Sequence, residues 1–103
     1  MSMKFPCLDI DDSLIYSLAR KYKVKELSFF GSVLREDFNE SSDIDILIQF
    51  EDGADYSIFD LFEIKEEFEN ALGRDVDLVE KKGLRNPYRR ENILKTAKVI
   101  YAA

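Results

Sequence analysis

Several residue types are scarce or missing in this chain of 103 residues, and each absence removes a class of function. There is no histidine, which excludes histidine-dependent catalysis and zinc sites with histidine ligands. Cys7 is the single cysteine, so no internal disulfide can form, as is typical of a reducing compartment. The start has no apolar segment of the signal-peptide kind, and no run reaches membrane-spanning length. We therefore expect a cytoplasmic protein without membrane attachment.

Positive charge is also in short supply. The 15 Lys and Arg residues stand against 21 Asp and Glu residues, which gives a net charge of −6. A protein that binds nucleic acid needs a basic surface to neutralise phosphates, so direct nucleic-acid binding is not expected. A partner with a basic face, or a bound divalent cation, suits this charge better. Without histidine, acid–base or metal chemistry must use the abundant carboxylates.

What the chain does have is enough apolar sequence for one folded domain. Apolar residues make up 46% of the chain, and the length suits a single domain spanning residues 1–103. We interpret residues 1–10 as a short lead-in and expect the apolar tail at 99–102 to dock on the domain. The patterns between them predict helices at about 12–22, 32–36 and 57–72 and from Asn86-Pro87 onward, and strands at 24–30, 43–50 and 74–79. The order α-β-α-β-α-β-α indicates an α/β domain with a small mixed β-sheet and helices packed on it.

The helix predicted at 57–72 has clear start and stop signals. Ser57 with Asp60 three residues later resembles a capping box, and Gly73 is placed to end the helix. The residues assigned to its apolar face are Ile58, Leu61, Phe62, Ile64, Phe68, Ala71 and Leu72.

Two aspartates stand at the start of the most apolar predicted strand, 43–50. Residues two apart in a strand point to the same face, so the carboxylates of Asp43 and Asp45 project side by side. Two negative charges this close repel each other unless a cation neutralises them, and Mg²⁺ prefers carboxylate and phosphate oxygens. The pair therefore predicts a magnesium site, although solvated acids at a strand end give the same pattern.

Asp77 is a third candidate, on the strand predicted at 74–79. A carboxylate with apolar neighbours is costly to bury unless it is paired or bound to a metal, although an exposed edge strand also tolerates it. If this strand lies beside strand 43–50, Asp77 completes a three-carboxylate site. Asp75 lies on the same face by the period of the strand, so spacing alone leaves either residue open as the third acid.

A Gly31-Ser32 pair falls between the strand predicted at 24–30 and the short helix predicted at 32–36. Glycine permits a tight turn, and Ser32 can cap a helix whose free N–H groups bind an anion. The pair predicts a cradle for nucleotide phosphates, with an ordinary strand–helix turn as the alternative. Arg35 either contacts phosphate or holds this loop by pairing with an acid such as Asp37, and the second role is favoured.

A basic run stands out in this acidic chain. It is usually a solvated loop and helix face, with phosphate contact or a partner surface as the alternative. Its members are Lys81, Lys82, Arg85, Arg89 and Arg90.

These parts combine into one mechanism. The Gly-Ser turn holds a nucleoside triphosphate, Asp43 and Asp45 hold Mg²⁺, and Asp77 completes a second metal site or acts as a base. One or two Mg²⁺ ions then position the triphosphate and an incoming hydroxyl for in-line displacement.

Residues 29–50, FFGSVLREDFNESSDIDILIQF, resemble the signature of the DNA polymerase β-like nucleotidyltransferase superfamily. That signature is a Gly-Ser turn, an Asp-x-Asp pair about ten residues later and a third acid on a later strand. The GSVLRxDF form and the short length resemble the minimal nucleotidyltransferase (MNT) antitoxins, over about 24–101. The resemblance implies that Gly31 and Ser32 contact the nucleotide phosphates and that Asp43 and Asp45 bind metal. It also implies that Asp77, rather than Asp75, is the third catalytic acid.

The resemblance further implies a partner and a reaction. Members of this group act with a HEPN-domain toxin, usually a ribonuclease, and some transfer AMP from ATP to a tyrosine of that partner. This implies a hetero-oligomer in which the chain is a protein adenylyltransferase that uses ATP and Mg²⁺. The alternative is an antitoxin that blocks its partner by binding alone. A small-molecule nucleotidyltransferase is least favoured, because we expect no acceptor-binding domain in the short stretch after Asp77.

Overall fold

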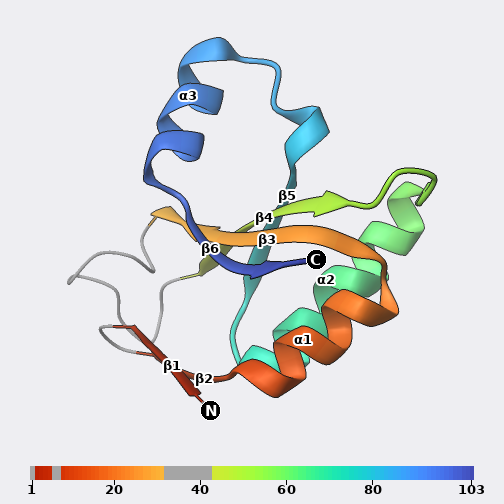
Figure 1. The fold of residues 1–103 in the computed structure, drawn as a ribbon, viewed down its shortest axis with the longest axis vertical. Coiled ribbons are helices and arrows are strands. Elements are labelled where there is room, and N and C mark those ends of the chain that lie inside the picture. The colour runs from red at the N-terminus through yellow and green to blue at the C-terminus, as the bar shows by residue number, and fades with distance from the viewer. Residues whose placement is uncertain (1, 6–7, 32–42) are drawn as a thin grey trace.

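The computed structural model describes residues 2–5, 8–31 and 43–103 (Figure 1). The elements follow in this order: β1 (Ser2–Phe5), β2 (Leu8–Asp11), α1 (Asp12–Lys21), β3 (Val24–Phe30), β4 (Ile44–Phe50), α2 (Ile58–Leu72), β5 (Val76–Glu80), the 3-10 turn η2 (Lys81–Gly83), α3 (Pro87–Thr96) and β6 (Lys98–Ala102). The helix predicted at 32–36 lies outside the described residues.

A mixed sheet with the strand order β5-β4-β3-β6 forms the centre of the fold. β3 pairs antiparallel with both β4 and β6, whereas β4 and β5 run parallel, as their connection through α2 requires. The α/β class with a small mixed sheet, predicted from the sequence, is therefore confirmed.

Two segments at the ends of the chain differ from the prediction. The stretch interpreted as a lead-in contains the antiparallel hairpin β1–β2, and the tail expected only to dock is strand β6, paired with β3. Both segments are short, and β6 is recognisable as a strand only through a partner that lies far away in the sequence. The expected element order therefore lacked one hairpin and one strand.

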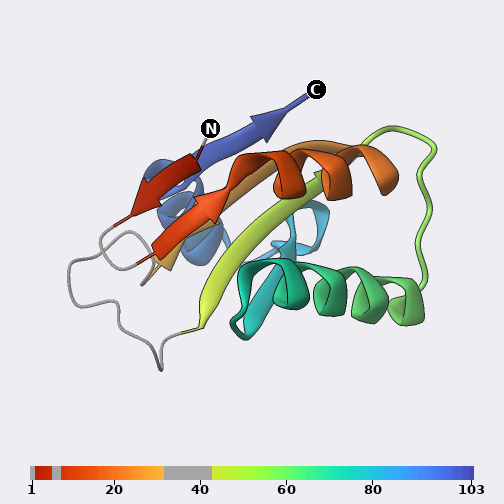
Figure 2. The same cartoon turned by 90° about the horizontal axis from the view of Figure 1, so that it is seen from below.

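The two faces of the sheet are covered by different helices. α1 and α2 lie side by side across one face, and α3 stands on the other (Figure 1, Figure 2). Because side chains alternate along a strand, Ile44, Ile46 and Ile48 of β4 are fully buried on the face of α1 and α2. Leu47 points the other way and packs on the side of α3, in a smaller cluster that also contains Phe30, Leu84 and Ile93.

This alternation fixes the position of the acids. Asp43 and Asp45 have the same parity as Leu47, so they share the face of α3 and not the face of α1 and α2. Asp43 is exposed and Asp45 is half-buried.

α2 begins and ends at the residues that the sequence predicts. Ser57 Oγ accepts a hydrogen bond from the Asp60 amide at 3.2 Å, and the Asp60 carboxylate accepts one from the Ser57 amide at 2.9 Å, so the capping box is confirmed. Gly73 ends the helix with a left-handed φ of 69°. The predicted apolar face is too wide, however, since Ile58 and Phe62 are 61% and 62% exposed.

None of the helices within the described ranges combines the length and the apolar character that crossing a bilayer requires.

Candidate functional site

The end of β3 and the beginnings of β4 and β5 bring a glycine and several acids together. In the strand register, Phe30 of β3 lies opposite Asp45 of β4, and Asp45 lies opposite Asp77 of β5. Facing residues on adjacent strands point to the same side of a sheet, so the carboxylates of Asp45 and Asp77 are neighbours on the face of α3. The predicted adjacency of the two acidic strands is therefore present, and it rests on their parallel pairing.

The acids just before these strands lie beside one another as well. The Ile44 amide donates to the Asp75 carbonyl oxygen at 3.0 Å, which aligns Asp43 with the residue that precedes β5. Asp75 and Asp77 are both exposed, but Asp77 is the one paired in register with Asp45. Strand pairing thus supports Asp77 as the third acid, and the catalytic and metal-binding roles of all three acids stay predictions.

Two features favour glycine at position 31: its backbone conformation and the carboxylate beside it. Its φ of 72° is left-handed, a conformation that costs other residues free energy. A Cβ built on Gly31 would also overlap the Asp45 carboxylate, with Cγ of Asp45 only 3.2 Å away. The left-handed φ of Gly31 agrees with the predicted turn, and any other residue at this position would displace the Asp45 carboxylate.

Glu69, which the sequence reasoning did not select, fixes the start of β5. Its carboxylate accepts hydrogen bonds from the Val76 amide at 3.0 Å and from Lys65 Nζ at 3.2 Å. The bond from the Val76 backbone, assisted by Lys65 and opposed by partial burial, holds the pKa of Glu69 below its usual value. Since Asp77 directly follows Val76, Glu69 fixes the backbone next to Asp77.

A sequence signal for Glu69 does exist. An acid near the C-terminal end of a helix interacts unfavourably with the helix dipole, and it is therefore expected where it has a specific donor. Glu69 lies four residues before Gly73, which ends α2, and its donor is the next strand.

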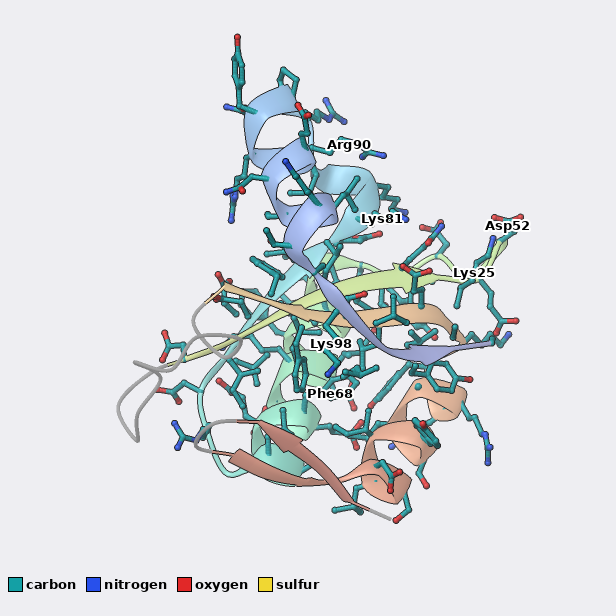
Figure 3. All side chains as sticks on the ribbon, turned by 60° about the vertical axis from the view of Figure 1, so that its left-hand side comes forward. Lys25, Asp52, Phe68, Lys81, Arg90 and Lys98 are labelled. Carbon is teal, nitrogen blue, oxygen red and sulfur yellow. The ribbon has the colours of Figure 1, made fainter. Side chains whose placement is uncertain are left out.

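Of the other predicted site residues, the structure describes only the basic run. Ser32 and Arg35, predicted to contact the nucleotide, lie outside the described residues. The basic run lies around η2 and α3, and Figure 3 shows Arg90 and Lys81 on the α3 side of the sheet and Phe68 on the α2 side. Lys82, Arg85, Arg89 and Arg90 are exposed, as a solvated face requires.

The donor chemistry of the acids fits a hard divalent cation such as Mg²⁺, because all the candidate ligands are carboxylate oxygens. The missing Cβ of Gly31 lets the Asp45 carboxylate lie directly against the backbone of the turn. Across residues 2–5, 8–31 and 43–103, no three Asp, Glu, His or Cys side chains stand close enough together to hold a metal ion. The fit therefore rests on the register pair Asp45 and Asp77, with Asp43 two positions before Asp45.

A family comparison agrees with this arrangement of glycine and acids. The family model described as nucleotidyltransferase domain matches residues 12–100, nearly the whole chain. The chain belongs to this nucleotidyltransferase family. Its matched region contains Gly31 and all three candidate acids, and the membership predicted from residues 29–50 is confirmed.

Individual relatives show which kind of nucleotidyltransferase this chain is similar to. A Methanocaldococcus jannaschii protein named as a candidate protein adenylyltransferase is 45% identical over 76 residues, which cover 74% of this chain and 76% of that protein. Protein adenylyltransferase MntA of Thermococcus cleftensis is 39% identical over 69 residues, covering 67% of this chain and 68% of that one.

A solved structure shows the same fold. It is the tri-AMPylated Shewanella oneidensis HEPN toxin in complex with MNT antitoxin. One of its chains matches with a TM-score of 0.65 at 22% identity, over 89% of this chain and 70% of that chain. The predicted enzyme class, a nucleotidyltransferase of the protein adenylyltransferase group, is confirmed by the family and by the named relatives.

Proposed function

We propose that this chain is a Mg²⁺-dependent adenylyltransferase that transfers AMP from ATP to a tyrosine hydroxyl of a HEPN-type toxin and thereby neutralises it. The chain is proposed to act as a single domain, in the cytoplasm and in complex with that partner. The observation that carries the proposal is the register pair of Asp45 and Asp77, set against the backbone of Gly31. The names of the relatives support protein as the acceptor, and the complex of Shewanella oneidensis supports a HEPN toxin as the partner.

The reaction is a displacement at phosphorus. The tyrosine oxygen forms a bond to the α-phosphorus of ATP while the bond from that phosphorus to the β-phosphate oxygen breaks. Pyrophosphate leaves, and the proton of the hydroxyl passes to a carboxylate of the site. Such transfers need little covalent help from the protein and depend on alignment and charge neutralisation.

The residues of this chain have distinct tasks in that scheme. Asp43, Asp45 and Asp77 would hold Mg²⁺, which supplies positive charge to the phosphates when bound. Gly31 lets the backbone run against Asp45, and with Ser32 and Arg35 it is proposed to face the nucleotide phosphates. Glu69 keeps Asp77 opposite Asp45 by holding the Val76 amide.

The test uses the purified chain with ATP, Mg²⁺ and the HEPN-domain protein encoded beside it. Intact-mass measurement should show addition of AMP to the HEPN-domain protein, and peptide mapping should place it on a tyrosine. Asp45→Asn should remove the transfer. Asp52→Asn is the matched control, because Asp52 is exposed in the loop beyond the opposite end of β4 (Figure 3). If Asp45→Asn transfers AMP as well as Asp52→Asn does, the proposed site is wrong.

One observation favours a second candidate, an antitoxin that inhibits by binding alone. The described side chains do not form a three-residue metal-binding group. This candidate predicts that Asp43→Asn/Asp45→Asn still neutralises the toxin and that the toxin recovered from the complex is unmodified. The adenylyltransferase proposal predicts the opposite result in both measurements.

A further inference from the structure

The first turn and a half of α2 exposes large apolar side chains. Phe59 is 80% exposed, Phe62 is 62% exposed and Ile58 is 61% exposed. These three residues are called here the α2 patch. Phe62 is three positions from Phe59 and four from Ile58, so it is the neighbour of both on the helix surface. Together they expose on the order of 300–400 Å² of apolar surface, a size that often marks an interaction site on a soluble protein.

The α2 patch continues into a groove at the edge of the sheet. The groove has a volume of about 140 Å³, and Ile58, Leu61 and Phe62 form its helix side. Ile48 and Leu78 form its floor from β4 and β5, and Lys65 and Glu80 complete it. β5 is one of the two edge strands of the four-stranded sheet, so the groove lies at that edge. A bulky apolar side chain of a partner can therefore enter beside Phe62.

The surroundings of the α2 patch are acidic. Glu63 and Glu66 are exposed, and they follow Phe59 and Phe62 by four positions each, so each acid lies one turn along the helix from a phenylalanine. Asp55, before the helix, is exposed as well. The surface is therefore an apolar centre bordered by negative charge.

Charge decides what this surface can bind. A second copy of the chain would place the same acids against each other, since a symmetric dimer brings one patch onto itself and the net charge is −6. Nucleic acid and anionic membranes carry the same sign and are also disfavoured. The complementary surface has apolar side chains surrounded by Lys and Arg, and it belongs to a different protein.

We infer that the α2 patch and its groove are the docking surface for a protein partner whose contact surface is apolar and bordered by basic residues. Only the identity of that partner, the HEPN-type toxin, rests on the proposed function. Leu78 lines the groove on one face of β5, and its neighbour Asp77 points to the other face. A partner held in the groove therefore lies at the sheet edge that carries Asp77, on the face opposite the carboxylates.

The test measures binding of the HEPN-domain protein encoded beside this chain to the purified full chain by isothermal titration calorimetry. The variants are Phe59→Ser and Phe62→Ser. The matched control is Tyr88→Ser, because Tyr88 is an aromatic residue that is 84% exposed in the first turn of α3. We expect each phenylalanine variant to weaken binding by more than about tenfold and the tyrosine control to leave it unchanged. Far-UV circular dichroism checks that each variant is folded.

Charge and self-association provide independent readouts. Glu63→Lys should weaken binding and reduce its dependence on salt concentration. Unchanged affinity in both phenylalanine variants overturns the inference, and so does a wild-type chain that does not bind the HEPN-domain protein. Dimerisation of the chain alone that Phe59→Ser abolishes also overturns it, because the occupant is then a second copy.

The two proposals fail in different ways. If the wild-type complex forms through the α2 patch but no AMP is transferred, docking stands and the adenylyltransferase proposal fails. If AMP is transferred and both phenylalanine variants bind normally, the adenylyltransferase proposal stands and the docking surface is elsewhere.

Discussion

The contact between Gly31 and Asp45 gives the sharpest prediction, because the chain contains a second glycine with the same backbone and no such contact. Gly31 has a φ of 72° and Gly73 has a φ of 69°, so alanine is strained to a similar degree at both positions. A Cβ at Gly73 meets nothing within 4 Å, whereas a Cβ at Gly31 meets the Asp45 carboxylate. Comparing the two alanine variants therefore isolates the effect of that contact.

The expected losses of unfolding free energy follow from two costs, the left-handed backbone and the contact with Asp45. Left-handed backbone costs alanine about 1–2 kcal/mol, which should be the whole loss of unfolding free energy for Gly73→Ala. Gly31→Ala must also push the Asp45 side chain out of its rotamer, which adds about 0.5–1.5 kcal/mol. A carboxylate displaced by about 1 Å at a phosphoryl-transfer site should lower the rate of AMP transfer about a hundredfold.

Two measurements check this prediction. Urea denaturation followed by circular dichroism gives the unfolding free energies, and intact mass over time gives the rate of AMP transfer to the HEPN-domain protein. We expect Gly73→Ala to transfer AMP at the wild-type rate and Gly31→Ala to be nearly inactive while still folded. Equal stability and equal transfer rates in the two variants would show that Gly31 does not hold the backbone against Asp45.

Further substitutions test the acids and the helix that positions them. Asp77→Asn should abolish AMP transfer measured by intact mass, yet change the unfolding free energy by less than about 0.5 kcal/mol, because the side chain is exposed. Glu69→Ala removes the acceptor of the Val76 amide and should cost about 1 kcal/mol in urea denaturation, whereas Glu69→Gln keeps an acceptor oxygen and should cost less. The folded pKa of Glu69 lies below the reference value of 4.5, so its carboxylate stabilises the fold fully above pH 4.5. This stabilisation is lost as the pH falls through the folded pKa. In Glu69→Gln, the melting temperature should therefore fall less steeply with decreasing pH. Ser57→Ala breaks the capping box at the other end of α2 and should cost about 1 kcal/mol in urea denaturation.

Local signals in the sequence were sufficient for the elements nearest the site. The strand at 24–30 and the caps of α2 were predicted correctly, because alternation, a capping box and a glycine stop act within a few residues. The strand β6 was predicted only as a docked tail, because its identity depends on pairing with β3. Helical spacing placed Phe62 on the apolar face, but it could not show how little of α2 the sheet covers.

The sequence indicated which residue types form the candidate site better than it indicated how they are arranged in space. Spacing placed Asp43 and Asp45 on one strand face, but it left Asp75 and Asp77 as alternatives, because the choice requires the parallel register of β4 with β5. The position of Glu69 near the end of α2 indicates that it needs a donor, but the donor itself, the Val76 amide of the next strand, follows only from the fold.

The pairing of β6 with β3 has a consequence for how the chain acquires its structure. β3 carries the turn at Gly31, and its second edge is covered only by β6, whose residues come last in the described chain. During synthesis, one edge of β3 therefore stays unpaired until Lys98–Ala102 have been made. An unpaired strand edge readily pairs with other chains. The growing chain is therefore most prone to wrong strand pairing in the interval between the synthesis of β4 and that of β6.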